Sequence, residues 1–276
     1  MTGQDHDWHT LDVAERERQF NPRVAVGNDR VEAYLAGYAA RSAAMRRHWN
    51  GRFDVRYGTG EKATLDVFLP RTEVPAPPFV FIHGGYWRAL DKHEHHFVVE
   101  PALEAGFAAV LPNYDLCPNV TLDDILAQMR ACMAFLAAQG SGLDLDMRAV
   151  HFAGHSAGAH LAAMVLHDAD CPLALASAHL ASGIYEPAVV LDLTVNDDVR
   201  LTPEMAERND ALRRPPASTL PIRVTVGGAE PEGWIAQSRA YARLAGVPLE
   251  VIDGADHFSL LDHPMLPPQR SSVADP

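Results

Sequence analysis

The sequence predicts an α/β fold in which helices cover both faces of a mostly parallel, doubly wound sheet of about eight strands. The first observation is an alternation of short apolar runs with longer Ala- and Leu-rich stretches along most of the 276 residues. The second is that runs such as PFVFIH at 78–83 are continuously apolar, as expected for strands buried on both faces. A chain of this length fits one large domain.

The first 50 residues differ from the rest, and we expect them to form a helical arm packed on the main domain at 51–276. Residues 30–48 have helical composition and spacing, and FNPR at 20–23 predicts a loop before them. The expected strands are 53–57, 64–69, 78–83, 107–113, 148–153, 173–180, 222–226 and 249–252, the first two joined as a hairpin by Gly58-Thr59-Gly60. The expected helices are 93–105, 121–139 with Thr121 and Asp124 as reciprocal caps, one from 157, and 233–245. The proline-rich stretch 184–216 is the candidate cap or lid.

Composition narrows the classes of partner. The chain has 36 acidic and 23 basic residues, a net charge of -13, which disfavours nucleic acid and anionic membrane surfaces as partners. No apolar run approaches the roughly 18 residues of a membrane helix, and residues 1–10 lack the pattern of a signal peptide. Three cysteines without CxxC spacing predict reduced thiols. We therefore expect a cytoplasmic protein acting on a small molecule, and a homodimer stays open.

GHSAG at 154–158 is the strongest chemical signal, because it matches G-x-S-x-G in the setting that this motif requires. It follows the apolar strand AVHFA and precedes the helical stretch HLAAMVL. This strand–turn–helix context predicts a nucleophile elbow that presents Ser156, with glycines where side chains would collide with neighbouring backbone. The alternative is a serine that merely caps a helix.

HGGYW at 83–87 follows the third expected strand and predicts an oxyanion hole. Backbone N–H groups of a glycine loop at this place can stabilise the tetrahedral intermediate of acyl transfer. The candidates are the amides of Gly85, Tyr86 and Ala157. Taken alone, the motif would be a simple glycine turn.

GADHF at 254–258 follows the last strand and supplies the candidate base, His257, in the chain order serine, acid, histidine. The acid is expected in the turn after strand 222–226, where Glu230 would orient His257. Competing carboxylates are Glu232, Asp253 and Asp256.

DKHEHH at 91–96 raises the question of a metal, because helical ligands need i, i+3 or i+4 spacing. Only His93 and His96 have that spacing, and no supporting motif is near. We expect a solvated helix face and no metal.

Together, HGGYW, GHSAG, the glycine–acid turn and DHF resemble the arylformamidase (kynurenine formamidase)-like branch of the α/β-hydrolases, related to the hormone-sensitive-lipase-like esterases. The resemblance runs from about residue 21 to about residue 261. HGGYW is fairly specific to this branch, whereas many esterases share GHSAG. The resemblance implies an α/β-hydrolase fold and cofactor-free hydrolysis of an N-formyl aryl amide such as N-formylkynurenine. Tyr86, Trp87, His155 and Phe258, with the 184–216 stretch, would then border the substrate pocket.

Two alternatives remain from the residues. A short-chain carboxylesterase or carbamate hydrolase would use the same groups. A ligand-binding protein without activity would be expected to lack the nucleophile or the base, and both are present here.

Overall fold

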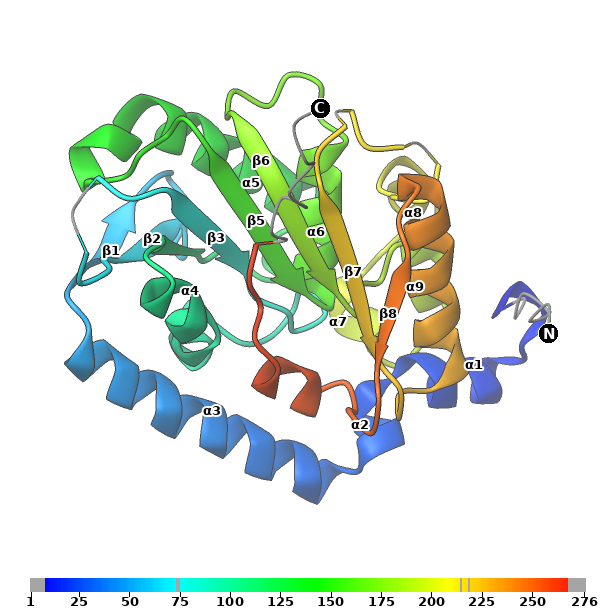
Figure 1. The fold of residues 1–276 in the computed structure, drawn as a ribbon. Coiled ribbons are helices and arrows are strands. Elements are labelled where there is room, and N and C mark those ends of the chain that lie inside the picture. The colour runs from blue at the N-terminus through cyan, green and yellow to red at the C-terminus, as the bar shows by residue number, and fades with distance from the viewer. Residues whose placement is uncertain (1–7, 73–74, 214, 218, 268–276) are drawn as a thin grey trace, which may run out of the picture.

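The computed structural model describes residues 8–72, 75–213, 215–217 and 219–267. Residues 1–7, which belong to the stretch where we expect no signal peptide, lie outside the described residues. Residue 214 of the cap candidate also lies outside them. An eight-stranded sheet in the order β1-β2-β4-β3-β5-β6-β7-β8 forms the centre of the molecule (Figure 1). The expected α/β-hydrolase architecture is confirmed.

Strand direction follows the expected pattern. β1 and β2 form an antiparallel hairpin, β2 pairs antiparallel with β4, and every other neighbouring pair is parallel. The strands are β1 Gly51–Arg56, β2 Thr64–Phe68, β3 Pro78–Ile82, β4 Ala108–Pro112, β5 Val150–His155, β6 Leu175–Ala181, β7 Ile222–Gly227 and β8 Leu249–Ile252. Because the carboxyl ends of β3, β5, β6 and β7 meet at one edge, the loops that follow them can build one site.

The helices separate into two layers because alternate residues of each strand face opposite sides of the sheet. Val80 and Ile82 belong to a buried cluster with α5, α6 and α9, whereas Phe79 and Phe81 belong to a second cluster with α3 and α4. The helices are α1 Val13–Phe20, α2 Pro22–Val26, α3 Asn28–His48, α4 Glu100–Glu104, α5 Leu122–Gln139, α6 Ala157–Leu166, α7 Asn196–Val199, α8 Pro203–Arg208 and α9 Glu232–Ala245. None of the helices in the described ranges is long and apolar enough to cross a membrane.

Residues 13–48 form three helices that run beneath the sheet edge, with α3 as the long rod in Figure 1. The Tyr38 ring of α3 packs 4.8 Å from that of Phe97, and its hydroxyl donates a hydrogen bond of 2.6 Å to the carbonyl of Phe258. Near the other end, Arg46 pairs with the buried carboxylate of Asp66 at 3.4 Å. Residues far apart in the sequence therefore hold the helices of this segment on the domain.

Two expectations for local structure are wrong. Residues 20–23 do not form a simple loop, because the Asn21 side chain accepts a hydrogen bond from the Arg23 amide and Pro22 starts α2. Asn as cap and Pro as first residue are a helix-start signature. The expected helix 93–105 is broken into the 3₁₀ turns Lys92–Glu94 and His96–Val99 and α4. Pro101 lacks the N–H that a continuous helix would need there.

Candidate active site

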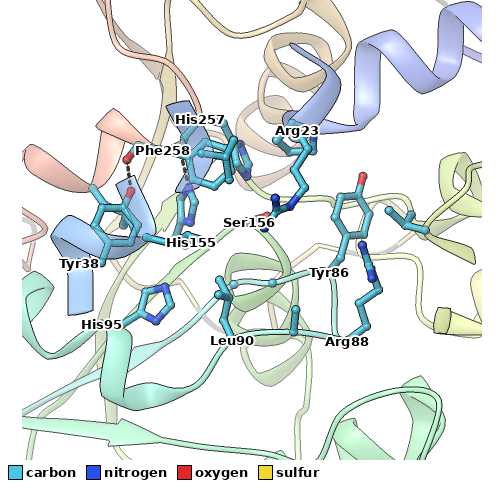
Figure 2. Close-up of a pocket in the computed structure, with 18 of the residues that line it drawn as sticks. Arg23, Tyr38, Tyr86, Arg88, Leu90, His95, His155, Ser156, His257 and Phe258 are labelled. Atoms are coloured by element: carbon cyan, nitrogen blue, oxygen red, sulfur yellow. Dashed lines mark hydrogen bonds between the residues drawn. The ribbon is translucent and has the colours of Figure 1, made fainter. Parts of the chain in front are cut away.

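Ser156 lies between β5 and α6 in a strained backbone conformation. Its φ is 56° and its ψ is -123°, values that non-glycine residues rarely adopt, and its side chain does not cap α6. Strain of this kind persists only where the surroundings enforce it. The side chain lines a cavity at the carboxyl edge of the sheet (Figure 2).

Two glycines enforce the bend at Ser156. A Cβ on Gly154 would lie 2.3 Å from the carbonyl oxygen of Gly158, and a Cβ on Gly158 would lie 2.0 Å from that of Ile82. Both contacts are far inside van der Waals distance, so neither position accepts a side chain. The physical reason expected for the glycines of GHSAG applies in this structure.

His257 and Glu230 meet at the same edge, from the loops after β8 and β7. Nδ1 of His257 lies 2.7 Å from Oε2 of Glu230, and both side chains are buried. The amide of Gly227 donates to Oε1 of Glu230 at 2.8 Å, which fixes the carboxylate. Glu230 is thus placed to hold the imidazole in one orientation and to stabilise its protonated form.

Ser182, directly after β6, is a member of this group that the motifs did not reveal. Its hydroxyl donates to Glu230 Oε2 at 2.6 Å and lies 3.0 Å from His257 Nδ1. Its φ of 47° shows that its backbone is also constrained. A polar residue directly after a buried strand was the available signal.

The competing acids lie elsewhere. Asp256 accepts hydrogen bonds from Arg30 and Tyr34 of α3, Glu232 pairs with Arg239, and Asp253 is exposed. Glu230 is the carboxylate that contacts His257.

The loop after β3 passes next to Ser156. Gly84 is so close that a Cβ there would lie 3.0 Å from both the Ser156 Cβ and the His155 carbonyl oxygen. Gly85 and Tyr86 have φ values of 111° and 53°, and Gly85 has no room for a Cβ because the carbonyl oxygen of Ala89 would lie 2.0 Å away. Within the described ranges, the amides of Gly85, Tyr86 and Ala157 donate no hydrogen bond to a backbone carbonyl.

Buried hydrogen bonds hold the loop after β3 in place on the side away from Ser156. Nδ1 of His83 lies 2.7 Å from the carbonyl oxygen of Gly84, and its Nε2 lies 3.0 Å from Oδ1 of Asn113. Burial lowers the pKa of His83, so its imidazole is neutral. The hydroxyl of Tyr114 donates to the His83 carbonyl at 2.8 Å, which further restricts the loop.

Ser156 and His257 line one cavity together with the loop Gly84–Leu90 and with residues of α2 and α3. Among the described residues no hydrogen bond joins the two side chains. The last residue of β5, His155, lies beside His257: its Nε2 is 2.9 Å from the His257 carbonyl oxygen, and the two ring centroids are 4.7 Å apart. Burial lowers the pKa of His155 well below its usual value, so it stays neutral and can donate from Nε2.

Comparison with known proteins adds to this geometry. A family model described as BD-FAE matches residues 65–173. Kynurenine formamidase of Danio rerio is 31% identical, with 93% of this chain and 92% of that protein covered, and kynurenine formamidase of Salmo salar is 29% identical, with 92% of each covered. The chain belongs to the kynurenine formamidase family. It is a serine hydrolase of the formamidase and esterase type, and the resemblance seen in its motifs is confirmed.

Solved structures share the fold of this chain. A Silicibacter protein provisionally described as a thioesterase has a TM-score of 0.77 at 26% identity, covering 92% of this chain and 94% of that one. An esterase from Pyrobaculum calidifontis has a TM-score of 0.65 at 16% identity, covering 93% and 88%, a likeness of fold alone.

The pocket of this family member differs from our expectation in two respects. Trp87 is fully buried with its ring 5.2 Å from that of His160, and it does not line the cavity. The 184–216 stretch contributes only Val195 among the described lining residues. The opposite wall comes instead from α2 and α3, and the helical composition of this segment gave no sign of which face meets the site. Tyr86, His155 and Phe258 line the cavity as expected.

The histidines of 91–96 are not a solvated helix face. His95 and His96 are almost fully buried, and His96 Nε2 lies 2.9 Å from Asp66. His93, Asp54 and Asp66 bring potential metal ligands within 4.8 Å of one another. The ammonium of Lys92 lies 2.5 Å from Asp54 and 2.9 Å from Asp66, and Arg46 lies 3.7 Å and 3.4 Å from the same two side chains, so cations of the chain already pair with both carboxylates.

Proposed function

We propose that this protein removes the formyl group from an N-formyl aryl amide such as N-formylkynurenine, through an acyl-enzyme on Ser156. The observation that carries the proposal is that one cavity is lined both by Ser156, on its strained bend, and by His257, whose Nδ1 is held by Glu230. The names of the fish relatives support the choice of a formamide.

The first step forms the acyl-enzyme. Nε2 of His257 accepts the proton of the Ser156 hydroxyl while the serine oxygen attacks the formyl carbon. Negative charge then develops on the carbonyl oxygen, where the amides of Gly85, Tyr86 and Ala157 can stabilise it. When the tetrahedral intermediate collapses, the C–N bond breaks and the aryl amine leaves with the proton from His257.

The second step releases the formyl group. Water gives a proton to His257 and attacks the formyl ester, and collapse of the second intermediate returns the proton to Ser156 and yields formate. Glu230 stabilises the imidazolium in both steps.

A comparison of two substrates tests the proposal. We expect the wild-type protein to convert N-formylkynurenine with a higher kcat/KM than phenyl acetate, followed by the absorbance of the released amine or phenol. Ser156→Ala should lower kcat for both substrates by about 10⁴-fold or more with an unchanged circular dichroism spectrum. Ser141→Ala, at an exposed serine, is the matched control. Turnover of the ester alone would indicate a carboxylesterase, and full activity of Ser156→Ala would exclude this nucleophile.

A further inference from the structure

We infer that Arg23 and Arg88 form a carboxylate-binding subsite in the cavity that contains Ser156, so that the substrate carries a carboxylate on the part that leaves. The inference rests on the proposed function for the position of the scissile bond. The two arginines come from different segments, α2 and the loop after β3, and both line this cavity.

The charge of the cavity wall is opposite to that of the chain. The chain has a net charge of -13, yet the described lining residues include two arginines and neither aspartate nor glutamate. The two wall histidines whose pKa burial lowers, His95 and His155, do not add charge. Each guanidinium is also paired with a carboxylate that does not line the cavity, so the two arginines offer an anionic ligand directional donors rather than an excess of positive charge.

Both arginines keep free donors. Figure 2 shows the Arg23 side chain extending from α2 toward the position of Ser156 and the Arg88 side chain extending beside Tyr86. The hydrogen bonds of the described residues use one nitrogen of each guanidinium: Arg23 donates to Glu32 at 2.8 Å, and Arg88 donates to Asp198 at 2.6 Å. A guanidinium has five donors, so each can also bind a carboxylate.

The ion pairs alone do not account for these side chains. Glu32 is 66% exposed and Asp198 is 53% exposed, and pairs this accessible to solvent contribute little to stability. Nε of Arg88 is buried and has no hydrogen-bond partner among the described residues. A buried donor without a partner is unfavourable, so the Arg88 side chain is held in this position at a cost in stability.

The rest of the cavity wall indicates which chemical group accompanies the carboxylate. Side chains of Val31, Leu35, Leu90 and Phe258 give the cavity apolar surface, which suits an aromatic ring. No described carboxylate of the wall could pair with an ammonium group. The geometry therefore assigns recognition to the carboxylate of an aryl substrate, and not to an α-amino group beside it.

Two pairs of substrates test the subsite. The first pair is N-formylkynurenine and its carboxamide, and the second is 4-acetoxybenzoate and 4-acetoxybenzamide. We expect the wild-type protein to prefer the carboxylate in each pair, and Arg23→Gln or Arg88→Gln to lower the carboxylate-to-carboxamide ratio of kcat/KM by about 10- to 100-fold. Arg130→Gln is the matched control, because Arg130 also pairs with an aspartate but lies outside the cavity.

A measurement on the wild-type protein keeps the test valid if a variant does not fold. KM for each carboxylate should rise with salt concentration while KM for its carboxamide does not. Equal kcat/KM values within both pairs, or ratios unchanged in both arginine variants, would overturn the inference. Failure of the proposed function has a different signature, because the formamide pair would not be hydrolysed while the ester pair still reports the carboxylate preference.

Discussion

The two walls of the cavity are built by different physical means. The wall at the sheet edge, with Ser156, is defined by backbone packing so tight that a methyl group fits at neither Gly154 nor Gly158. The wall from α2 and α3 is held by side-chain contacts such as Arg30 to Asp256 at 2.8 Å and Tyr38 to the Phe258 carbonyl. The comparison shows that the nucleophile is positioned by tightly packed backbone. The helical wall that faces it is positioned by individual side-chain contacts, each of which a single substitution can remove.

The largest effect is expected at the rigid wall. Glu230→Gln keeps the shape of the side chain but removes the charge that stabilises the His257 imidazolium, so kcat should fall by about 10³- to 10⁴-fold. The matched control is Glu232→Gln, two positions away, whose carboxylate pairs with the partly exposed Arg239 and does not contact His257. Steady-state kinetics with an aryl ester measures both variants. Equal activity of the two variants would mean that the carboxylate does not act through His257.

A pair of glycine substitutions compares the tightly packed backbone next to Ser156 with the exposed face of α3. Gly158→Ala should destabilise the protein by about 3 kcal/mol or more, because its Cβ would meet the carbonyl oxygens of Ile82 and His83. Gly37→Ala, on the exposed side of α3 with open space around it, should stabilise the protein by about 1 kcal/mol. Urea denaturation measures both changes. Changes of the same sign would contradict the difference between the walls.

As the pH falls, we expect α3 to detach from the rest of the domain before the sheet unfolds. Burial alone would raise the pKa of Asp66, but hydrogen bonds from His96 and the Asp54 amide and the charge of Lys92 outweigh it and lower the pKa to about 2. The ionised carboxylate therefore stabilises the fold above the unfolded-state pKa near 4, and about 2 kcal/mol is lost as the pH falls from 4 to 2.

The pKa of Asp256, which binds Arg30, is also lowered, because hydrogen bonds from Ser259, Tyr34 and Phe258 outweigh the effect of burial. Both carboxylates contact α3, so its docking should weaken in this range. Brief digestion with pepsin at pH 2.5 to 4, followed by mass spectrometry, should give its first cleavages within residues 28–48. If the first cleavages fell in β3 or β5, the sheet would unfold before or together with the detachment of α3, and the prediction would be wrong.

The two walls also differ in how far the sequence predicts them, because one depends on local backbone sterics and the other on contacts between distant residues. GHSAG, with its neighbouring strand and helix, is a contiguous signal whose geometry depends on local sterics, so the bend at Ser156 could be predicted. His257 and Glu230 could be proposed from their positions after strands, and the structure places them 2.7 Å apart. The strands of the sheet were predicted with small errors at their ends, because buried apolar runs are also local signals.

The α3 wall could not be predicted, because docking depends on pairs such as Tyr38 and Phe258 that lie 220 positions apart. Prolines directed attention to 184–216, yet breaks in regular structure do not show which surface a segment covers. Ser182 was missed because a serine after a strand has many roles, and only its contacts with Glu230 and His257 distinguish it.

The contacts of Arg30 with Asp256 and of Tyr38 with Phe258 have a consequence for biosynthesis. Chains leave the ribosome from the N-terminus, so α3 emerges more than two hundred residues before the loop that anchors it. A nascent chain that ends before residue 256 has neither His257 nor the loop that anchors α3. The pocket is therefore completed only after these residues have emerged, and products that end before them lack the proposed base.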